Sequence, residues 1–237
     1  MKIETFASGS TGNAYRVSDG RTVLLLECGL PIRKLRKCSG YRLHELTACL
    51  VSHEHGDHAC AAHDLSALGI PVLCSAGTAQ ALGAVDGELV RGTLRASDPV
   101  RVGTFSVSPF PVIHDAAEPL GFWLHSDEDG ETLLFVTDSA DAPWTLSESP
   151  THIMIECNHL GAESMLGTNY FQARRTLDNH LSLADCTAFL RRQDLSATQD
   201  IRLIHISRRH GDPDTMRRAA AAASGRRIII AQEEIER

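Results

Sequence analysis

The sequence predicts an α/β protein of the αββα sandwich type, in which two β-sheets pack face to face and helices cover their outer surfaces. Short strands separated by polar turns fill the first and middle parts of the chain, whereas helical patterns alternate with strands in its last part. The chain has 237 residues, of which 43% are apolar and 22% are charged, the composition of an ordinary globular protein. Because no linker or repeat interrupts the pattern, we expect one domain that spans residues 1–237.

Strands are expected where β-branched and aliphatic residues form short runs between polar or glycine-containing turns. The expected strands are residues 3–7, 14–18, 22–26, 48–51, 72–74, 105–110, 121–125, 132–137, 152–156, 201–206 and 227–231. The longest aliphatic runs end at a charge or a glycine, and none approaches the roughly 18 to 20 uncharged apolar residues of a membrane span. We therefore expect no membrane as a partner.

Helices are expected where apolar residues recur at intervals of three and four residues. The expected helices are residues 31–38, 58–68, 76–82, 170–179, 183–192 and 213–223. Since these helices lie between the expected strands, they can cover the outer faces of the two sheets.

The charge of the chain is unevenly distributed. Its 23 basic and 30 acidic residues give a net charge of −7, which argues against a protein that coats nucleic acid by bulk electrostatics. Residues 41–169 hold 18 acidic residues against 4 basic ones, together with nine of the twelve histidines. An acidic segment rich in histidine is expected to bind cations, although we interpret the acidic run at 127–131 as a solvated hairpin turn.

The cysteines indicate a reducing environment. They are seven in number and form no CxxC pair, so neither a disulfide framework nor a cysteine zinc cluster is expected, and we interpret them as reduced and mostly buried. The opening MKIETFASGS lacks the basic segment and long apolar core of a secretory signal. We therefore expect the protein in the cytoplasm.

The most informative segment is the motif HxHxDH, which directly follows the strand expected at 48–51 and consists of His53, His55, Asp57 and His58. Three imidazoles and a carboxylate on one turn can gather around one point, and such ligands favour Zn, Mn or Fe over calcium. His53 and His55 can project to one side of the turn while Asp57 and His58 face another. This arrangement predicts two adjacent metal ions.

Four ligands cannot saturate two ions, and three further strand ends supply candidates. His114, Asp138 and His205 each follow an apolar run. Any one of them alone would be interpreted as an ordinary loop histidine or a helix-capping aspartate. Because they follow the motif in the order His, Asp, His, we expect them to complete the metal site.

Beyond the metal motif, several segments are similar to the metallo-β-lactamase-fold hydrolases, and among them to the YycJ/WalJ group. These segments are ASGSTGNA (7–14), HDAAEPLGF (114–122), TDS (137–139), ECNH (156–159), NHLS (179–182) and HIS (205–207). The resemblance covers nearly the whole chain and implies the metallo-β-lactamase fold. Members of the group are described as divalent-metal phosphodiesterases that act as exonucleases on DNA, and they are relatives of tRNase Z and of the phosphonate-pathway phosphodiesterase PhnP.

The resemblance implies a cofactor of two divalent ions, Zn or Mn. It places His53, His55 and His114 on one ion and Asp57, His58 and His205 on the other. Asp138 is expected to bridge the two ions. A water shared by two such ions would be a hydroxide at cellular pH and could attack a phosphodiester. Asp57 and His180 are the expected catalytic residues, with His180 as the candidate acid for the leaving alkoxide.

Six residues are expected to contact the substrate: Ser8, Ser10, Asn13, Asn158, His159 and His180. The loop at 8–13 can donate hydrogen bonds to a phosphate, although a turn that needs Gly9 and Gly12 explains the loop equally well. The resemblance suggests Asn158, His159 and His180 as neighbours of the metals.

Two groups of side chains bear on a nucleic-acid substrate. Basic residues at 33–37, 174–175, 208–209 and 217–218 can hold a phosphate backbone, or they are solvated helix faces. Aromatic residues make up only 5% of the chain, so stacking platforms for single strands are limited to Phe6, Tyr15, Tyr170 and Phe171.

The chain departs from the family pattern at Glu27, where relatives usually carry an aspartate that supports the metal ligands from behind. We expect Glu27 to keep that role despite its extra methylene group. Glu54 stands in an HEH turn and not in the HExxH helix of zinc peptidases, so we expect it to be exposed.

The leading functional hypothesis is a di-metal phosphodiesterase that hydrolyses nucleic acid, as a DNA exonuclease. The alternatives are a small or cyclic nucleotide phosphodiesterase, which the net charge favours, and a lactone or thioester hydrolase. A binding protein that keeps its metals but has lost activity is a further alternative, which Glu27 alone suggests. Because relatives often form dimers, a homodimer is also expected.

Overall fold

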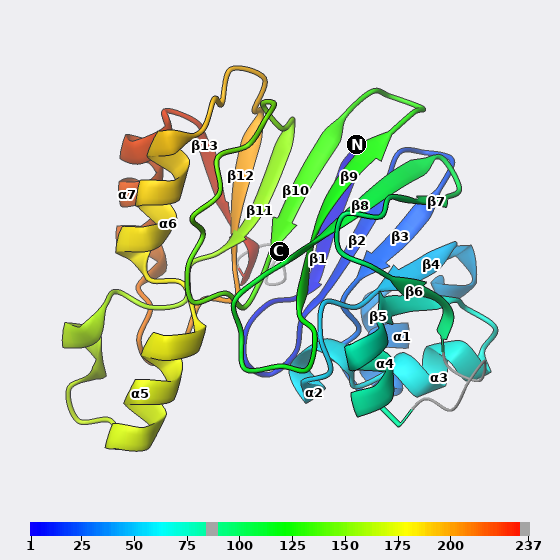
Figure 1. The fold of residues 1–237 in the computed structure, drawn as a ribbon, viewed down its shortest axis with the longest axis horizontal. Coiled ribbons are helices and arrows are strands. Elements are labelled where there is room, and N and C mark those ends of the chain that lie inside the picture. Colours follow the sequence, from blue (N-terminus) through cyan, green and yellow to red (C-terminus); the bar gives the residue numbers. More distant parts are fainter. Residues whose placement is uncertain (84–89, 233–237) are drawn as a thin grey trace.

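The computed structural model describes residues 1–83 and 90–232, whose strands form two mixed β-sheets packed face to face (Figure 1). The first sheet has the strand order β1 to β6, with β1, β2 and β3 antiparallel and β3 to β6 parallel. Its strands are β1 (Lys2–Ala7), β2 (Ala14–Ser18), β3 (Val23–Leu26), β4 (Ala48–Leu50), β5 (Val72–Ser75) and β6 (Val90–Leu94).

The second sheet has the strand order β13-β12-β11-β10-β9-β8-β7. Strands β7 to β10 are antiparallel to their neighbours, whereas β10 to β13 run parallel. Its strands are β7 (Val100–Val102), β8 (Phe105–Pro111), β9 (Leu120–Ser126), β10 (Thr132–Val136), β11 (His152–Glu156), β12 (Asp200–Ile204) and β13 (Arg227–Ile230). In each sheet the parallel strands bring their carboxyl ends to one edge.

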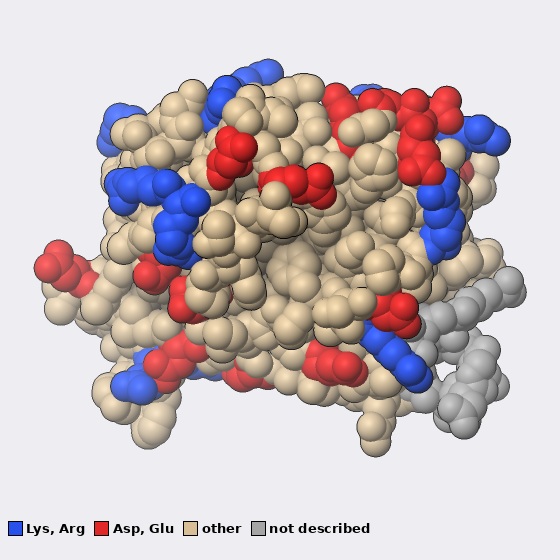
Figure 2. Space-filling view, turned by 45° about the horizontal axis from the view of Figure 1, so that its top comes forward, with Lys and Arg blue, Asp and Glu red and all other residues tan. Residues whose placement is uncertain are grey.

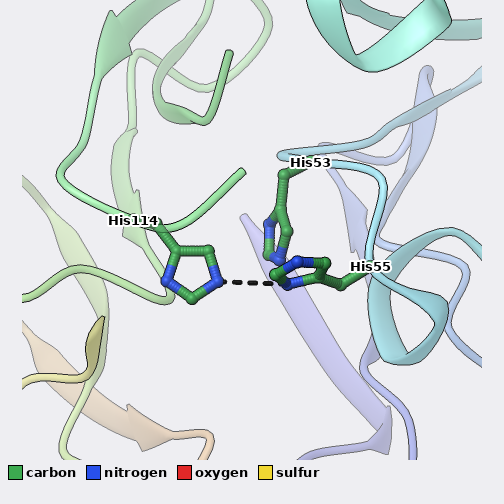
Figure 3. Close-up of side chains that lie close together, drawn as sticks. All are labelled: His53, His55 and His114. Atoms are coloured by element: carbon green, nitrogen blue, oxygen red, sulfur yellow. Dashed lines mark hydrogen bonds between the residues drawn. The ribbon is translucent and has the colours of Figure 1, made fainter. Parts of the chain in front are cut away.

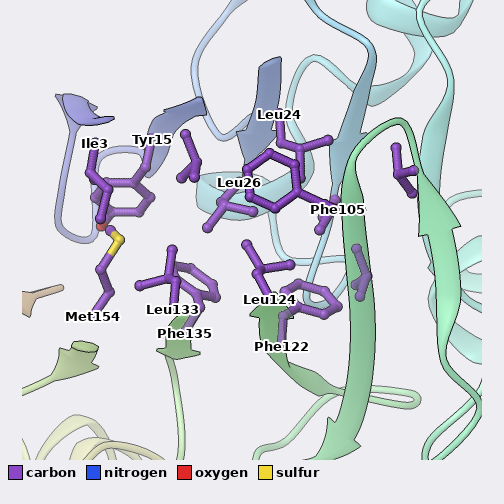
Figure 4. Packing of buried hydrophobic residues seen from close by; sticks show 14 of the residues in the cluster. Ile3, Tyr15, Leu24, Leu26, Phe105, Phe122, Leu124, Leu133, Phe135 and Met154 are labelled. Atoms are coloured by element: carbon purple, nitrogen blue, oxygen red, sulfur yellow. The ribbon is translucent and has the colours of Figure 1, made fainter. Parts of the chain in front are cut away.

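The core between the sheets is built from large apolar side chains of both (Figure 4). Tyr15 of β2 and Phe135 of β10 come from different sheets, and their ring centroids lie 5.8 Å apart in an edge-on arrangement. Phe122 of β9 stacks against Phe135 at 6.2 Å. All three rings are fully buried, and each contributes about 1.5–3 kcal/mol through removal of its surface from water.

Helices cover the outer faces of both sheets, which confirms the predicted αββα arrangement. Along β10 the side chains alternate: Leu133 and Phe135 face the inner core, whereas Leu134 and Val136 pack beneath α6 and α7. The helices are α1 (Ile32–Cys38), α2 (Gly56–Ala59), α3 (Ala62–Ala67), α4 (Ala76–Ala81), α5 (Tyr170–Asn179), α6 (Leu183–Arg192) and α7 (Pro213–Ser224), with short 3₁₀ turns η1 (Leu43–Glu45) and η2 (Ala162–Met165).

One expected helix was wrong, and two strands were not predicted. The helix expected at 58–68 is two helices, α2 and α3, because the amide of Ala61 donates to the carbonyl of Cys28 on a neighbouring segment. Strand β7 was missed because it has only three residues, and β6 because Gly92 and two polar residues hide its alternation.

Two further observations concern composition. Five of the seven cysteines are buried, as predicted. Within the described part of the chain the longest of these helices, α7, has 12 residues, and no helix there has the length and apolar character needed to span a bilayer.

Candidate metal centre

The candidate site lies where the carboxyl ends of strands from both sheets meet. Glu27 follows β3, Asp138 lies two residues after β10, and His205 follows β12. The HxHxDH motif begins three residues after β4 and continues into α2. Charged and imidazole side chains from separate strands are therefore delivered to one edge of the sandwich.

Three of these strand-end residues have a left-handed backbone. Glu27, Asp138 and His205 have φ angles of 63°, 42° and 52°, a region that residues other than glycine rarely occupy. Such a conformation costs roughly 1–2 kcal/mol per residue, and it turns the chain abruptly at the end of a strand. Unfavourable backbone geometry of this kind concentrates at functional sites.

One group of potential ligands consists of His53, His55 and His114, whose ring nitrogens lie within 4.8 Å of one another (Figure 3). His53 and His55 come from the motif, and His114 reaches across from the loop after β8. Nδ1 of His55 lies 3.2 Å from Nε2 of His114.

A second group consists of Asp57, His58 and His205. Oδ2 of Asp57 lies 3.3 Å from Nε2 of His205 and 3.5 Å from Nε2 of His58. These three side chains also come from both halves of the sandwich.

Asp138 lies between the two groups. Its Oδ2 is 3.2 Å from Nε2 of His58, 3.7 Å from Nε2 of His114 and 3.8 Å from Nε2 of His53. One carboxylate oxygen therefore faces ring nitrogens of both groups. All seven side chains expected as ligands are brought together. The potential ligand groups overlap, since Asp138 also groups with His53 and His58 and with Glu156, His180 and His205, so the division of the ligands between two ions stays a prediction.

The donor set fits divalent metal ions. In a tetrahedral site with bonds of 2.0–2.1 Å, neighbouring ligand atoms are about 3.3 Å apart, and the separations around Asp138 and Asp57 lie close to that value. Nε2 of His53 is buried and has no hydrogen-bond partner among the described residues, although it faces the cluster. A buried polar atom without a partner is costly, and a metal ion would satisfy it.

The charges of the cluster shift one another's pKa. Burial raises the pKa of Asp138, but the charges of His205 and His58 outweigh burial and hold this pKa well below its usual range. Burial lowers the pKa of His205, but the charge of Asp138 outweighs it and raises the pKa to about 10. Burial and the charge of His58 lower the pKa of His53. The site thus favours positive charge beside Asp138 and keeps His53 in the neutral form that binds metals.

The far ring nitrogens of two candidate ligands, His53 and His114, have partners that orient the rings. Nδ1 of His53 lies 2.8 Å from the Ser52 hydroxyl, and Nδ1 of His114 donates to the Asn179 carbonyl at 3.0 Å. Contacts of this type hold a ligand ring in one orientation and fix which nitrogen faces the metal.

Glu27 lies behind His58, as predicted. Its carboxylate is fully buried, Oε1 accepts a hydrogen bond from the amide of Ser52 at 3.1 Å, and Oε2 is 3.3 Å from Nδ1 of His58. The extra methylene group of glutamate is therefore accommodated without loss of the contact.

Glu156, the last residue of β11, organises the opposite side of the site. Its Oε1 lies 2.7 Å from Nδ1 of His180 and 2.9 Å from Nδ1 of His205, and its Oε2 accepts hydrogen bonds from the amides of Leu181 and Ser139. Glu156 is not among the residues predicted to belong to the site. The signal was present, because Glu156 is a charge at the end of an apolar strand, like Glu27 and His205.

The site opens into a pocket of about 420 Å³. Of the six residues expected to contact substrate, Ser10, Asn158 and His180 line it. The pocket wall also includes His55, Asp57, His114, Asp138, Thr168, Gln172, Arg175, Thr176, His205, Ser207, Arg209 and His210.

The other three expected substrate residues lie outside that lining. The Ser8 hydroxyl accepts hydrogen bonds from Tyr15 and from the amide of His205. Asn13 is fully buried, and its side chain bonds Gly9 and the carbonyl of Asp57. Both residues hold the loop and the motif in place, and their contact with substrate stays a prediction.

His159 and Glu54 also have defined partners. Nε2 of His159 donates to the carbonyl of His180 at 3.1 Å, and its Nδ1 accepts from the amide of Gly161. His159 therefore positions the backbone of His180, and its substrate contact stays a prediction. The expectation that Glu54 is exposed was wrong, since its half-buried carboxylate accepts a hydrogen bond from the amide of Ala117 at 2.8 Å.

Residues 22–229 match the family described as the beta-lactamase superfamily domain. Over 226 residues the chain is 25% identical to exodeoxyribonuclease YycJ of Bacillus anthracis, covering 87% of this chain and 83% of that protein. It is 27% identical over 226 residues to exodeoxyribonuclease WalJ of Streptococcus pneumoniae, covering 88% and 82%.

Among solved structures, the chain is similar to the metallo-beta-lactamase fold protein YhfI of Bacillus subtilis, with a TM-score of 0.72, 18% identity and coverage of 96% of this chain and 95% of that one. Human tRNase Z, short form, has a TM-score of 0.63, 15% identity and coverage of 88% and 93%. The expected metallo-β-lactamase fold is thereby confirmed.

Proposed function

The chain belongs to the beta-lactamase superfamily, and we propose that it is a di-metal phosphodiesterase that acts on nucleic acid, as a DNA exonuclease of the cytoplasm. The observation that carries the proposal is the position of Asp138, with one oxygen between two groups of three donors. The names of the two curated relatives, both exodeoxyribonucleases, support the choice of substrate.

Seven side chains would hold the two ions, Zn or Mn. One ion would be held by His53, His55 and His114, the other by Asp57, His58 and His205, with Asp138 shared. Bound divalent ions supply a water of lowered pKa as nucleophile and neutralise negative charge that develops on a phosphodiester. This explains how a chain with a net charge of −7 can act on an anion.

His180 is the proposed proton donor to the leaving oxygen. It lines the pocket, and Glu156 holds its Nδ1 at 2.7 Å. Burial lowers the pKa of His180, but the charge of Glu156 outweighs burial and raises it, which favours the protonated ring that can donate to a leaving alkoxide. Asp57, at the pocket wall, is proposed to orient the attacking water.

A second candidate function is hydrolysis of small or cyclic nucleotides. The pocket volume of about 420 Å³ lies within the range of sites that enclose a small ligand. The net charge of −7 also favours a small substrate over a long polyanion.

The test is an assay of purified protein, supplied with Zn or Mn, on end-labelled linear DNA, circular DNA and bis(4-nitrophenyl) phosphate. We expect mononucleotides to be released from the linear DNA, slow hydrolysis of the small diester and no cleavage of the circle. His180→Ala is expected to lower the rate on DNA by roughly 100-fold or more.

A matched control is His125→Ala, since His125 is a half-exposed histidine of β9 outside the pocket. Turnover of only the small diester would contradict the nuclease proposal and favour the second candidate. Equal rates for His180→Ala and His125→Ala would contradict the role of His180.

A further inference from the structure

Residues 160–179, here called the arm, stand apart from the sandwich between β11 and α6 (Figure 1). The arm contains η2 and α5, and none of the ten residues of α5 is buried. Leu166 is 88% exposed, Tyr170 71% and Phe171 78%. The arm carries four of the seven large hydrophobic side chains that are exposed within the described residues, the fourth being Leu160.

The arm is nevertheless firmly attached to the body. His210 is buried, and its Nδ1 donates to the carbonyl of Ser164 at 2.8 Å while its own carbonyl accepts from the amide of Leu160 at 3.0 Å. At the start of α5 the side chain of Asn169 caps the helix by accepting from the amide of Phe171. The exposed aromatic rings therefore stand on an ordered element.

One side of the arm forms a wall of the metal-centre pocket. Thr168, Gln172, Arg175 and Thr176 all line the pocket, and α5 ends directly before His180. Since α5 rises 1.5 Å per residue, Phe171 lies about 13 Å along the helix from His180. Phe171 itself lies outside the pocket lining, next to Gln172, which is part of it.

Phe171 and Arg175 share a side of α5, because residues four apart on a helix are neighbours. Arg175 reaches over to the loop that carries His114, where its Nε pairs with Oδ2 of Asp115 at 3.1 Å. Arg209 contributes a second guanidinium to the same pocket. The guanidinium groups of Arg175 and Arg209 therefore lie at the pocket that also contains candidate metal ligands.

We propose that the arm is a platform for the unpaired end of a nucleic-acid strand. Phe171, against whose ring Tyr170 packs edge-on with centroids 5.7 Å apart and planes at 76°, stacks a base, while Arg175 and Arg209 contact the phosphates that lead into the metal centre. This inference rests on the proposed function and refines it, since it names a single-stranded end as the form of nucleic acid that enters the pocket.

The structure favours these two rings over the other aromatic candidates. Phe6 is 9% exposed and Tyr15 is completely buried, so neither is open to a base. Charge favours a nucleic acid over a second copy of the chain as the molecule that binds the arm. The helix that carries Phe171 also contributes to a pocket lined by the guanidinium groups of Arg175 and Arg209, and not to a flat apolar face.

The experiment measures kcat and KM on a fluorescent single-stranded oligonucleotide, on a blunt duplex and on bis(4-nitrophenyl) phosphate. For Phe171→Ala we expect KM on the single strand to rise roughly 10-fold, with the rate on the small diester unchanged because that diester does not reach the platform. Phe171→Trp keeps a stacking surface and is expected to restore the parental KM.

Leu166→Ala is the matched control, since it removes an exposed apolar side chain of the same arm that cannot stack a base. An unchanged KM for Phe171→Ala combined with Tyr170→Ala would overturn the platform while leaving the proposed function intact. Dissociation of a dimer by Leu166→Ala and Phe171→Ala alike would overturn it in favour of a second copy. If the parent protein degrades no oligonucleotide, the proposed function itself fails.

Discussion

At the scale of single residues, Glu156 shows how one buried carboxylate can position two histidine side chains. It contacts a candidate ligand, His205, and the proposed proton donor, His180, through the same oxygen. Its second oxygen is held by two backbone amides, so the carboxylate itself cannot rotate. Glu156 therefore fixes the position of His180 relative to the metal ligands without lining the pocket.

We predict that Glu156→Gln lowers kcat on DNA by roughly 10- to 100-fold, the usual effect of losing a group that orients metal ligands. The amide cannot accept from both rings and both backbone amides. KM should change little, because Glu156 does not face the substrate. Steady-state kinetics together with the metal content per chain checks this, and Glu163→Gln, at an exposed position of η2, is the control. An equal fall of kcat in the Glu163→Gln protein would contradict the role of Glu156 in positioning His180 and His205.

Gly29 gives a second prediction at this scale. A Cβ atom at Gly29 would lie 1.6 Å from the carbonyl oxygen of Asp57 and 2.7 Å from the amide of His58, so the motif would have to move. We expect Gly29→Ala to lower the free energy of unfolding by about 3 kcal/mol or more and to abolish hydrolysis. Urea unfolding and the diester assay measure both effects.

The control for that variant lies inside the motif. A Cβ at Gly56 meets no atom within 4 Å. Gly56→Ala should therefore keep both stability and activity, and its unfolding and diester hydrolysis are compared with those of Gly29→Ala. Equal stability of the two variants would show that the backbone contact between Gly29 and Asp57 is absent in solution.

At the scale of elements, strand ends opposite the site are joined by a charged network. His152 at the start of β11 lies between two carboxylates: its Nδ1 is 3.2 Å from Asp200 at the start of β12, and its Nε2 is 3.2 Å from Glu131. The network ties neighbouring parallel strands at the edge away from the metal centre. It therefore contributes to register rather than to chemistry.

The pKa of Asp200 gives this network a pH dependence. Burial raises that pKa, but the hydrogen bond from His152 and the charge of Arg202 lower it below its ordinary value of 3.8. A carboxyl group with a depressed pKa stabilises the fold above 3.8 and loses this contribution as the pH falls through and below that value. Asp200→Asn should thus destabilise the protein by about 1–2 kcal/mol at pH 7, and by less near pH 3, where part of the carboxyl groups of the unfolded chain and of the fold are protonated.

Urea unfolding at the two pH values checks this prediction, with Asp98→Asn as the control because Asp98 is exposed. If Asp200→Asn lowers the free energy of unfolding by the same amount at both pH values, the ionised carboxylate is not what stabilises the strand ends.

At the scale of the whole molecule, the metal centre connects the two sheets at one edge. The motif follows a strand of the first sheet, whereas His114, Asp138 and His205 follow strands of the second. Charge is unevenly spread over the surface as well, and Figure 2 shows a face whose centre is largely uncharged, with acidic and basic side chains around it and the densest acidic group at the upper right. Local ligands, and not the net charge, therefore decide where an anion can bind.

Removal of metal should destabilise the whole sandwich, because ions that bind only the folded state stabilise it by mass action. We expect a chelator to lower the melting temperature by roughly 5–10 °C, the shift that corresponds to saturating binding for a chain of this size. Differential scanning fluorimetry with added Zn or Mn measures it. In the Asp138→Asn protein the chelator should have a much smaller effect, and an equal shift in both proteins would contradict the ligand role of Asp138.

Much of the architecture could be predicted from local pattern alone. Alternation identified the strands that carry ligands, and the HxHxDH spacing indicated a metal site because three imidazoles and a carboxylate within six residues are the ligand types that divalent transition metals prefer. The helix at 58–68 was misjudged because a hydrogen bond from Ala61 to Cys28, distant in sequence, ends α2. The single-domain organisation stays a prediction.

The sequence by itself determined which side chains could bind metals and in what order they occur, because ligand chemistry and strand periodicity are local properties. Only the tertiary structure decided that Asp138 lies between the two groups, that Glu156 joins His180 to His205, and that Phe171 is exposed on the helix that contributes Gln172, Arg175 and Thr176 to the pocket. These relations depend on how two sheets and one projecting helix meet in space, and no spacing along the chain encodes the distance between residues that are brought together by packing.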